Sequence, residues 1–218
     1  MEWDRSMSKP LAIAATLVAA FLLAACSEAP TAVTPAAKSE AVEKKEPPAP
    51  PMPVTAKTAF YEMYKPVRAW AADFMLLSLA SNEIPSLPSA DGKFGMWTGI
   101  FVSPSRSEAH TFTYSVVDSG ATIHKGVEDQ GSQAWSGPTP ASRPFQTMDF
   151  VVDSDAAYQT AFGKAKGWVE AHPGKKAAFT LANASRFPTP VWYILWGNKT
   201  SGYASFVSAS TGAIVKAR

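Results

Sequence analysis

Residues 191–215, VWYILWGNKTSGYASFVSASTGAIV, decide the fold of this chain. Aromatic and β-branched residues fill two runs, and glycine with polar residues separates them, which is typical of antiparallel strands joined by short turns. In the first run Trp192, Ile194 and Trp196 lie on one face of a strand, and the residues between them, which lie on the other face, are also apolar. We therefore expect a central strand with one face under a helix and the other face either covered by another part of the chain or open.

A helix is expected just before this stretch. Asp153 or Ser154 is suited to its N-cap, and apolar residues recur at helical spacing from Ala157 to Val169. His172-Pro173-Gly174 then ends it, since glycine and proline commonly follow a helix. Further strands are expected over residues 176–182, 203–207 and 213–216.

The first half of the folded part follows the same order. A helix is expected over residues 56–80, and strands over 94–102, 109–117 and 121–125. Trp97 aligns with Trp192, and the glycine-containing turn of residues 117–123 aligns with that of residues 209–215. The predicted fold class is therefore α+β, with two tandem units that each consist of a helix followed by an antiparallel meander.

A helix, a strand that carries tryptophan, and a hairpin that ends in Ser/Thr-Gly-x-Ile/Val resemble the PepSY domain, most closely over residues 155–218. The resemblance implies a cystatin-like fold for each unit. Where a function is known, PepSY domains inhibit or chaperone peptidases or bind other proteins. The resemblance thus implies a non-catalytic module with a periplasmic protein or peptide as its partner.

The N-terminal residues read as a secretory signal. Arg5 and Lys9 precede an apolar run over residues 11–23, and small residues follow. At about 13 residues the run is too short to span a bilayer comfortably. Either Met1 or Met7 could be the start, because the chain from Met7 keeps a basic residue before the run.

Leu23-Ala24-Ala25-Cys26 resembles the lipobox of bacterial lipoproteins, and Cys26 is the single cysteine of the chain. The resemblance implies cleavage before Cys26, lipidation of its thiol and attachment to a membrane through this lipid. Ser27, in place of aspartate, implies sorting to the periplasmic face of the outer membrane.

Proline and alanine dominate the residues that follow Cys26, so this segment cannot bury enough apolar surface to fold and is expected to be a disordered tether. The predicted organisation is a signal peptide (1–25), the lipidated cysteine and linker (26–56), a first PepSY-like unit (57–127), an inter-unit loop (128–150) and a second PepSY-like unit (151–218).

The composition excludes several classes of function. With 20 Lys+Arg against 18 Asp+Glu the net charge is only +2, so the strongly basic surface of a nucleic-acid binder is absent and no nucleic-acid partner is expected. A single cysteine excludes a disulfide framework. Nucleophile, zinc and nucleotide motifs are missing as well, so we expect no catalytic residue, no metal and no cofactor.

Two sets of residues remain as candidates for function. If the second sheet face is open, Trp97, Trp192, Trp196 and Tyr203 are candidate ligand contacts in a groove for a peptide or a glycan. The alternative is an envelope glycan- or peptidoglycan-binding protein or hydrolase, in which two loop carboxylates serve as acid and base. The carboxylates considered for that role are Glu128, Asp129, Asp149, Asp153 and Asp155.

Overall fold

The computed structural model describes residues 49–216. The predicted signal peptide, Cys26 and the linker up to residue 48 lie outside the described residues. The elements follow one another as α1 (Ala56–Trp70), β1 (Met75–Asn82), β2 (Met96–Ser103), β3 (Glu108–Ser115), β4 (Gly126–Ala134), η1 (Thr147–Asp149), α2 (Ser154–Ala171), β5 (Ala177–Ala182), β6 (Val191–Trp196) and β7 (Tyr203–Ser208).

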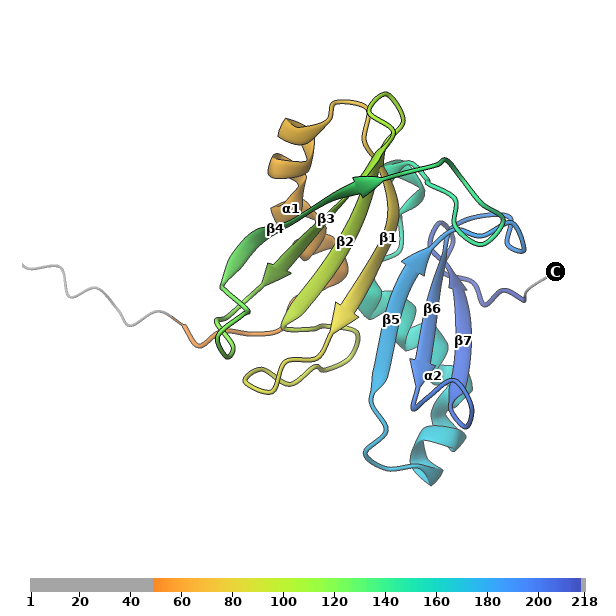
Figure 1. The fold of residues 1–218 in the computed structure, drawn as a ribbon. Coiled ribbons are helices and arrows are strands. Elements are labelled where there is room, and N and C mark those ends of the chain that lie inside the picture. The colour runs from red at the N-terminus through yellow and green to blue at the C-terminus, as the bar shows by residue number, and fades with distance from the viewer. Residues whose placement is uncertain (1–48, 217–218) are drawn as a thin grey trace, which may run out of the picture. The chain divides into compact units, whose positions relative to one another are not determined.

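The strands form one antiparallel sheet in the order β4-β3-β2-β1-β5-β6-β7. Strands β1 and β5 join the two halves through the pairs Ser78↔Ala182, Leu79↔Leu181 and Ala80↔Thr180. Both helices cover the same face of this sheet (Figure 1). The predicted α+β class is therefore confirmed.

Helix α1 is shorter than predicted. It begins after Thr55, whose hydroxyl accepts the Thr58 N–H, and it ends at Trp70, where the expected helix continues to residue 80. Residues 75–82 instead form β1, a central strand with a partner on each side. The carboxylate of Asp73 fixes the turn between them by accepting the Ser103 hydroxyl (2.7 Å) and the Ser105 N–H (2.9 Å). These partners are distant in sequence, so a local apolar pattern cannot reveal them.

The second half follows the predictions closely. Asp153 caps α2 by accepting the Ser154 N–H at 2.7 Å, and Ala157, Ala161 and Ala165 are its buried face. Helix α2 ends at Ala171, directly before His172. Strands β5, β6 and β7 lie within one residue of the predicted strands at each end.

The expected loop over residues 128–150 is wrong in its first part. Strand β4 occupies residues 126–134 and pairs with β3 along that strand's whole length, while residues 121–125 form a turn in place of the predicted strand. Strand β4 escapes prediction because its residues are mostly polar and exposed, with no apolar alternation. The strand expected over residues 213–216 is reduced to one bridge between Val207 and Ile214.

Trp97 and Trp192, which the sequence alignment paired, make matching contacts. The Trp97 indole donates to the Val54 carbonyl at 3.0 Å, and the Trp192 indole donates to the Val152 carbonyl at 2.8 Å. Each valine directly precedes the N-cap residue of a helix. The two indoles lie edge to face with centroids 6.3 Å apart, in the core that both halves share.

The N-termini of the two helices also meet. The Ala56 N–H donates to the Ser154 hydroxyl at 2.9 Å, and the Lys57 N–H donates to the Asp153 carboxylate at 3.0 Å. The first turn of α1 is thus hydrogen-bonded by residues of α2, and the contacts of the folded unit begin at Val54, inside the range expected to be linker.

Candidate functional site

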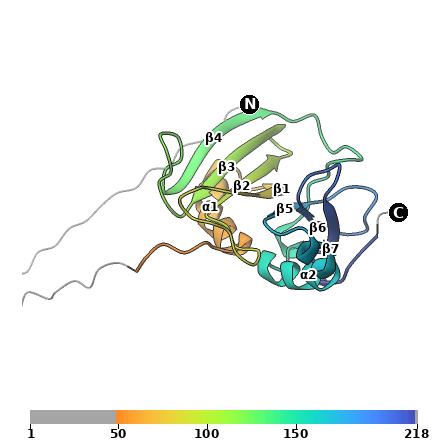
Figure 2. The same ribbon diagram turned by 90° about the horizontal axis from the view of Figure 1, so that it is seen from below.

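The sheet face opposite the helices is open to solvent along much of its area. Figure 1 looks onto this open face, and Figure 2 shows both helices on the other side. The strand register aligns one side chain from each of six neighbouring strands in a row across this open face. The side chains from β3, β2, β1 and β5 are small, and those from β6 and β7 are aromatic. The row runs through Thr113, Thr98, Ala80, Thr180, Tyr193 and Phe206.

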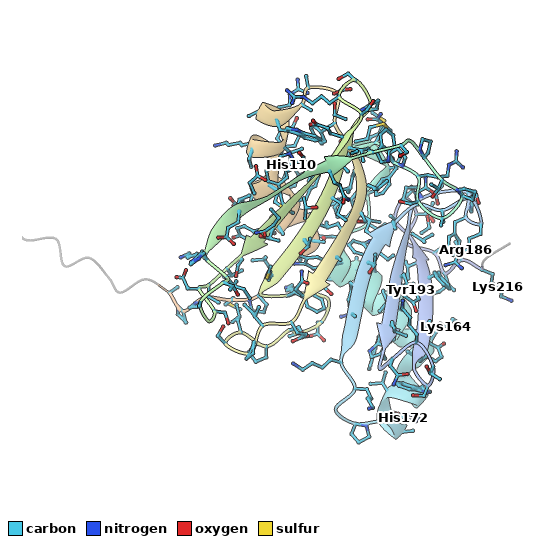
Figure 3. The ribbon with its side chains drawn as sticks, viewed as in Figure 1. His110, Lys164, His172, Arg186, Tyr193 and Lys216 are labelled. Atoms are coloured by element: carbon cyan, nitrogen blue, oxygen red, sulfur yellow. The ribbon has the colours of Figure 1, made fainter. Side chains whose placement is uncertain are left out.

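We call Arg186, Phe187, Tyr193 and Phe206 the aromatic cluster. Tyr193 of β6 and Phe206 of β7 are cross-strand partners, and their rings stack with centroids 5.2 Å apart. Phe187, from the loop after β5, packs on Phe206 at 4.9 Å. The Arg186 guanidinium lies 5.0 Å from the Phe187 ring and 5.4 Å from the Phe206 ring (Figure 3 labels Arg186 and Tyr193).

A cavity of about 360 Å³ adjoins the aromatic cluster at Arg186. Two loops line this open pocket, and they are held together by hydrogen bonds from the Ser185 N–H to the Pro140 carbonyl and from the Arg143 N–H to the Asn183 carbonyl. The cavity is lined by Pro140, Ala141, Ala184, Ser185 and Arg186. An arginine held over aromatic rings keeps its donors oriented, so this site is suited to a carboxylate or a carbonyl next to an apolar group.

The tryptophans singled out from the sequence are core residues. Trp97 and Trp192 are fully buried and Trp196 is 2% exposed, because their strand faces point toward the helices. Tyr203 is half-buried beside α2, and its hydroxyl donates to the Lys164 carbonyl at 3.3 Å. The aromatic side chain of β6 that reaches the open face is instead Tyr193, which is half-buried and alternates with the two β6 tryptophans. Alternation alone shows that β6 has two faces, but only the position of α2 decides which face is open.

The carboxylates considered for catalysis lie in two places, on β4 and between η1 and the start of α2, and four of the five bind nearby groups. Asp153 caps α2, Asp149 accepts the Gln146 N–H at 3.2 Å, and Asp155 accepts the Ala156 N–H at 2.8 Å. Glu128 and Asp129 lie on β4. Three of these five carboxylates therefore accept backbone hydrogen bonds that stabilise η1 and the start of α2.

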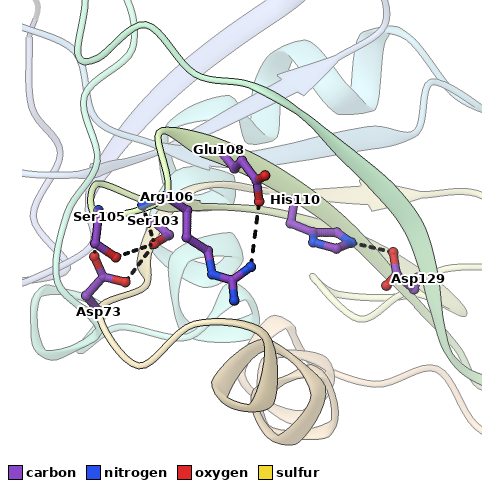
Figure 4. A network of polar contacts seen from close by, with 7 residues as sticks. All are labelled: Asp73, Ser103, Ser105, Arg106, Glu108, His110 and Asp129. Carbon is purple, nitrogen blue, oxygen red and sulfur yellow. Dashed lines mark hydrogen bonds and ion pairs between the residues drawn. The ribbon is translucent and has the colours of Figure 1, made fainter.

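Asp129 belongs to the polar network drawn in Figure 4. Its carboxylate contacts His110 Nε2 at 2.5 Å and accepts the Gly131 N–H at 2.7 Å. Partial burial raises the pKa of Asp129, but the hydrogen bonds from Gly131 and His110 and the interaction with the His110 charge outweigh it, so the net pKa lies below the usual value. This carboxylate is thus held ionised, and its contact with His110 ties β4 to β3.

His110 is packed between aromatic rings. Its ring stacks on Phe112 at 4.7 Å and meets Trp70 edge to face at 4.9 Å, while Nδ1 is buried with no hydrogen-bond partner. His124 lies elsewhere, in the turn before β4, where it faces Asp118 at 3.9 Å. The residues described do not contain a group of three or more His, Cys, Asp or Glu side chains placed to hold a metal ion.

Helices within residues 49–216 are too short or too polar to cross a membrane.

The chain matches no family model and no curated protein. Among solved structures, it has a likeness to a crystal structure from Clostridium difficile described as a "putative lipoprotein", with 9% identity and a TM-score of 0.44. The match covers 78% of this chain and 95% of that one. A likeness at this level carries no argument about fold or function. The relation to PepSY domains and the lipidation of Cys26 therefore remain predictions from the sequence.

Proposed function

We propose that this protein is a lipoprotein of the bacterial envelope, anchored through Cys26, whose folded part is a non-catalytic binding module. Its partner is a periplasmic protein, with a peptidase as the first candidate, and it binds at the open face through the aromatic cluster. The observation that carries the proposal is the stack of the exposed Arg186 on the half-buried Phe206 and Tyr193, on a sheet face that no helix covers.

The composition of the aromatic cluster favours a protein partner. Tyrosine and arginine dominate the residues whose loss weakens protein interfaces most, because they bury a large area and still offer hydrogen-bond donors. Here the Tyr193 ring stacks on Phe206 and the Arg186 guanidinium lies over the Phe187 ring, so both side chains are already ordered and lose little conformational freedom on binding. The neighbouring small side chains, Thr180, Ala80 and Thr98, leave room for a partner's side chains beside Tyr193.

The carboxylates support a non-catalytic role. A general acid needs a raised pKa, whereas the pKa of Asp129 is lowered. Asp149 and Asp153 bind backbone N–H groups at η1 and at the start of α2, which favours a structural role.

Glycan binding is the second candidate function. Sugar rings bind aromatic side chains next to hydroxyl groups, and Thr180 beside Tyr193, with Thr98 further along the same row, supplies such hydroxyls. Sedimentation with purified peptidoglycan tests this alternative: Tyr193→Ala would release the protein into the supernatant if a glycan is the ligand, and a protein partner predicts no sedimentation of either form.

Two experiments test the main proposal. Metabolic labelling with an alkyne fatty acid should tag the protein, and Cys26→Ser should abolish the label; a label that persists in this variant would refute the anchor.

A photo-crosslinking amino acid at position 193 should capture a protein partner in cells, and the same group at Gln159, an exposed position on α2, serves as the control. Arg186→Ala should weaken capture from position 193. Capture that is equal from positions 159 and 193, or absent from both, would refute binding at the open face.

A further inference from the structure

Helix α1 carries a stripe of cations and tyrosines on its outer side. The spacing is i, i+4, i+7, i+8 and i+11, so these side chains fall within about 100° of one another around the helix. The stripe is Lys57, Tyr61, Tyr64, Lys65 and Arg68. Glu62 lies outside it and faces β3, where burial and the charge of Glu62 together raise the pKa of Tyr114. The stripe therefore has three positive charges and no negative one.

Exposed apolar side chains flank this stripe on the segment before α2. Met148 is 79% exposed and Val151 is 57% exposed, and Tyr61 in the stripe is 68% exposed. Phe150 connects the two elements, because its ring packs on Phe60 at 6.2 Å and lies 5.5 Å from the Lys57 ammonium. Lys57 also donates to the Val151 carbonyl at 2.6 Å. We call Met148, Val151 and the α1 stripe the basal patch.

We propose that the basal patch rests on the bilayer to which the Cys26 lipid is attached. Tyrosine is favoured at the boundary between headgroups and acyl chains, where its ring is partly apolar and its hydroxyl stays hydrated. Burial of methionine and valine side chains at the same boundary is favourable because they are apolar, and cations beside them are attracted to anionic headgroups. Most monomeric proteins do not gather side chains this exposed and this apolar in one place without a use for them.

The position of the tether supports this choice of surface. The chain arrives at α1 through Val54, two residues before the helix begins, so the basal patch adjoins the point where the linker joins the folded unit. An anchor close by keeps the patch at a high effective concentration near the membrane, so a weak affinity is sufficient. This step rests on the proposed lipid anchor.

Docking in this way orients the binding module. Helix α1 lies on the side of the sheet opposite the open face (Figure 2). Its buried face packs on the sheet, so the stripe points away from the sheet. With the basal patch against the bilayer, the aromatic cluster faces the periplasm. Membrane contact and partner binding then use opposite sides of the molecule.

Chemical anchoring tests the proposal without relying on lipidation in cells. The mature chain, from Cys26 onward, is coupled through its single cysteine to a maleimide lipid in vesicles of phosphatidylethanolamine and phosphatidylglycerol. Tyrosine nitration is then quantified by mass spectrometry at Tyr61, in the basal patch, and at Tyr193, on the open face. Anchoring should slow nitration of Tyr61 about tenfold, which corresponds to about 1.4 kcal/mol of docking free energy, and leave that of Tyr193 unchanged.

Variants separate docking from simple proximity to the vesicle. The double variant Met148→Ser/Val151→Ser should restore nitration of Tyr61, and so should high salt, because the cations act through a screened field. Ile214→Ser is the matched control, since Ile214 is an exposed apolar residue far along the chain at β7, and it should change nothing. Equal nitration of Tyr61 in free and anchored chains, equal protection of Tyr61 and Tyr193, or protection that survives the double variant would overturn the proposal.

Discussion

Replacing Ser154 by alanine tests whether the two halves fold as one unit. Ser154 is fully buried, and its hydroxyl accepts the N–H of Ala56, the first residue of α1, at 2.9 Å. In Ser154→Ala this N–H remains buried without a partner. An unsatisfied buried donor costs about 1–3 kcal/mol, so we expect a loss of about 2 kcal/mol in the free energy of unfolding. The neighbouring bond from the Lys57 N–H to Asp153 is untouched, and the only other bond lost is the long one, 3.5 Å, that the Ser154 hydroxyl donates to the Asp153 carboxylate.

Urea unfolding followed by tryptophan fluorescence and by circular dichroism measures this loss. Both probes should report a single transition with an unchanged slope, and the midpoint of thermal unfolding should fall by about 4–8 °C for a domain of this size. A single transition is expected because Ser154 belongs to α2, whereas the group it satisfies belongs to α1.

A loss below about 0.5 kcal/mol, or separate transitions for the two halves, would refute the reasoning.

Three further predictions follow from the fold. Trp192→Phe leaves the partly buried Val152 carbonyl without its indole donor and should lower the free energy of unfolding by about 1–3 kcal/mol in denaturant titrations. In Trp97→Phe the Val54 carbonyl keeps the Phe94 N–H, so the loss should be smaller, and a larger loss for Trp97→Phe would contradict this reasoning. Gly92 has φ +80°, and a Cβ there would lie 2.4 Å from the Ser154 carbonyl oxygen. Gly92→Ala should therefore lower the free energy of unfolding by about 3 kcal/mol or more. Gly163 lies in open space on α2, so Gly163→Ala should raise the free energy of unfolding by about 0.5–1 kcal/mol. Hydrogen bonds from Ser103 and Ser105 lower the pKa of Asp73 to about 2. The stabilising contribution of Asp73 is therefore complete above the unfolded pKa of 3.8 and is lost as the pH falls toward 2. Asp73→Asn should flatten the acid limb of a plot of stability against pH, and an unchanged limb would show that the carboxylate is not bonded in this way.

The sequence predicted the features that depend on interactions between residues close together in the chain. The N-cap at Asp153, the small buried residues of α2 and the end of that helix before His172 depend on neighbours within one or two turns. Strands β5, β6 and β7 are largely apolar runs bounded by turn residues, so they too were predicted. The alignment of Trp97 with Trp192 needed only the repeated order of elements, and both indoles bind the carbonyl before a helix N-cap.

Tertiary structure decided the rest, because the decisive partners are far apart in the sequence. Strand β1 is a strand because β2 and β5 pair with it, and the polar strand β4 exists because β3 offers it an edge. The candidate site depended on the same kind of information. Both faces of β6 are apolar, and only the packing of α2 buries Trp192 and Trp196 and leaves Tyr193 on the open face. A pattern of period two separates the faces of a strand, but which face meets solvent is settled by the layer that packs on the other.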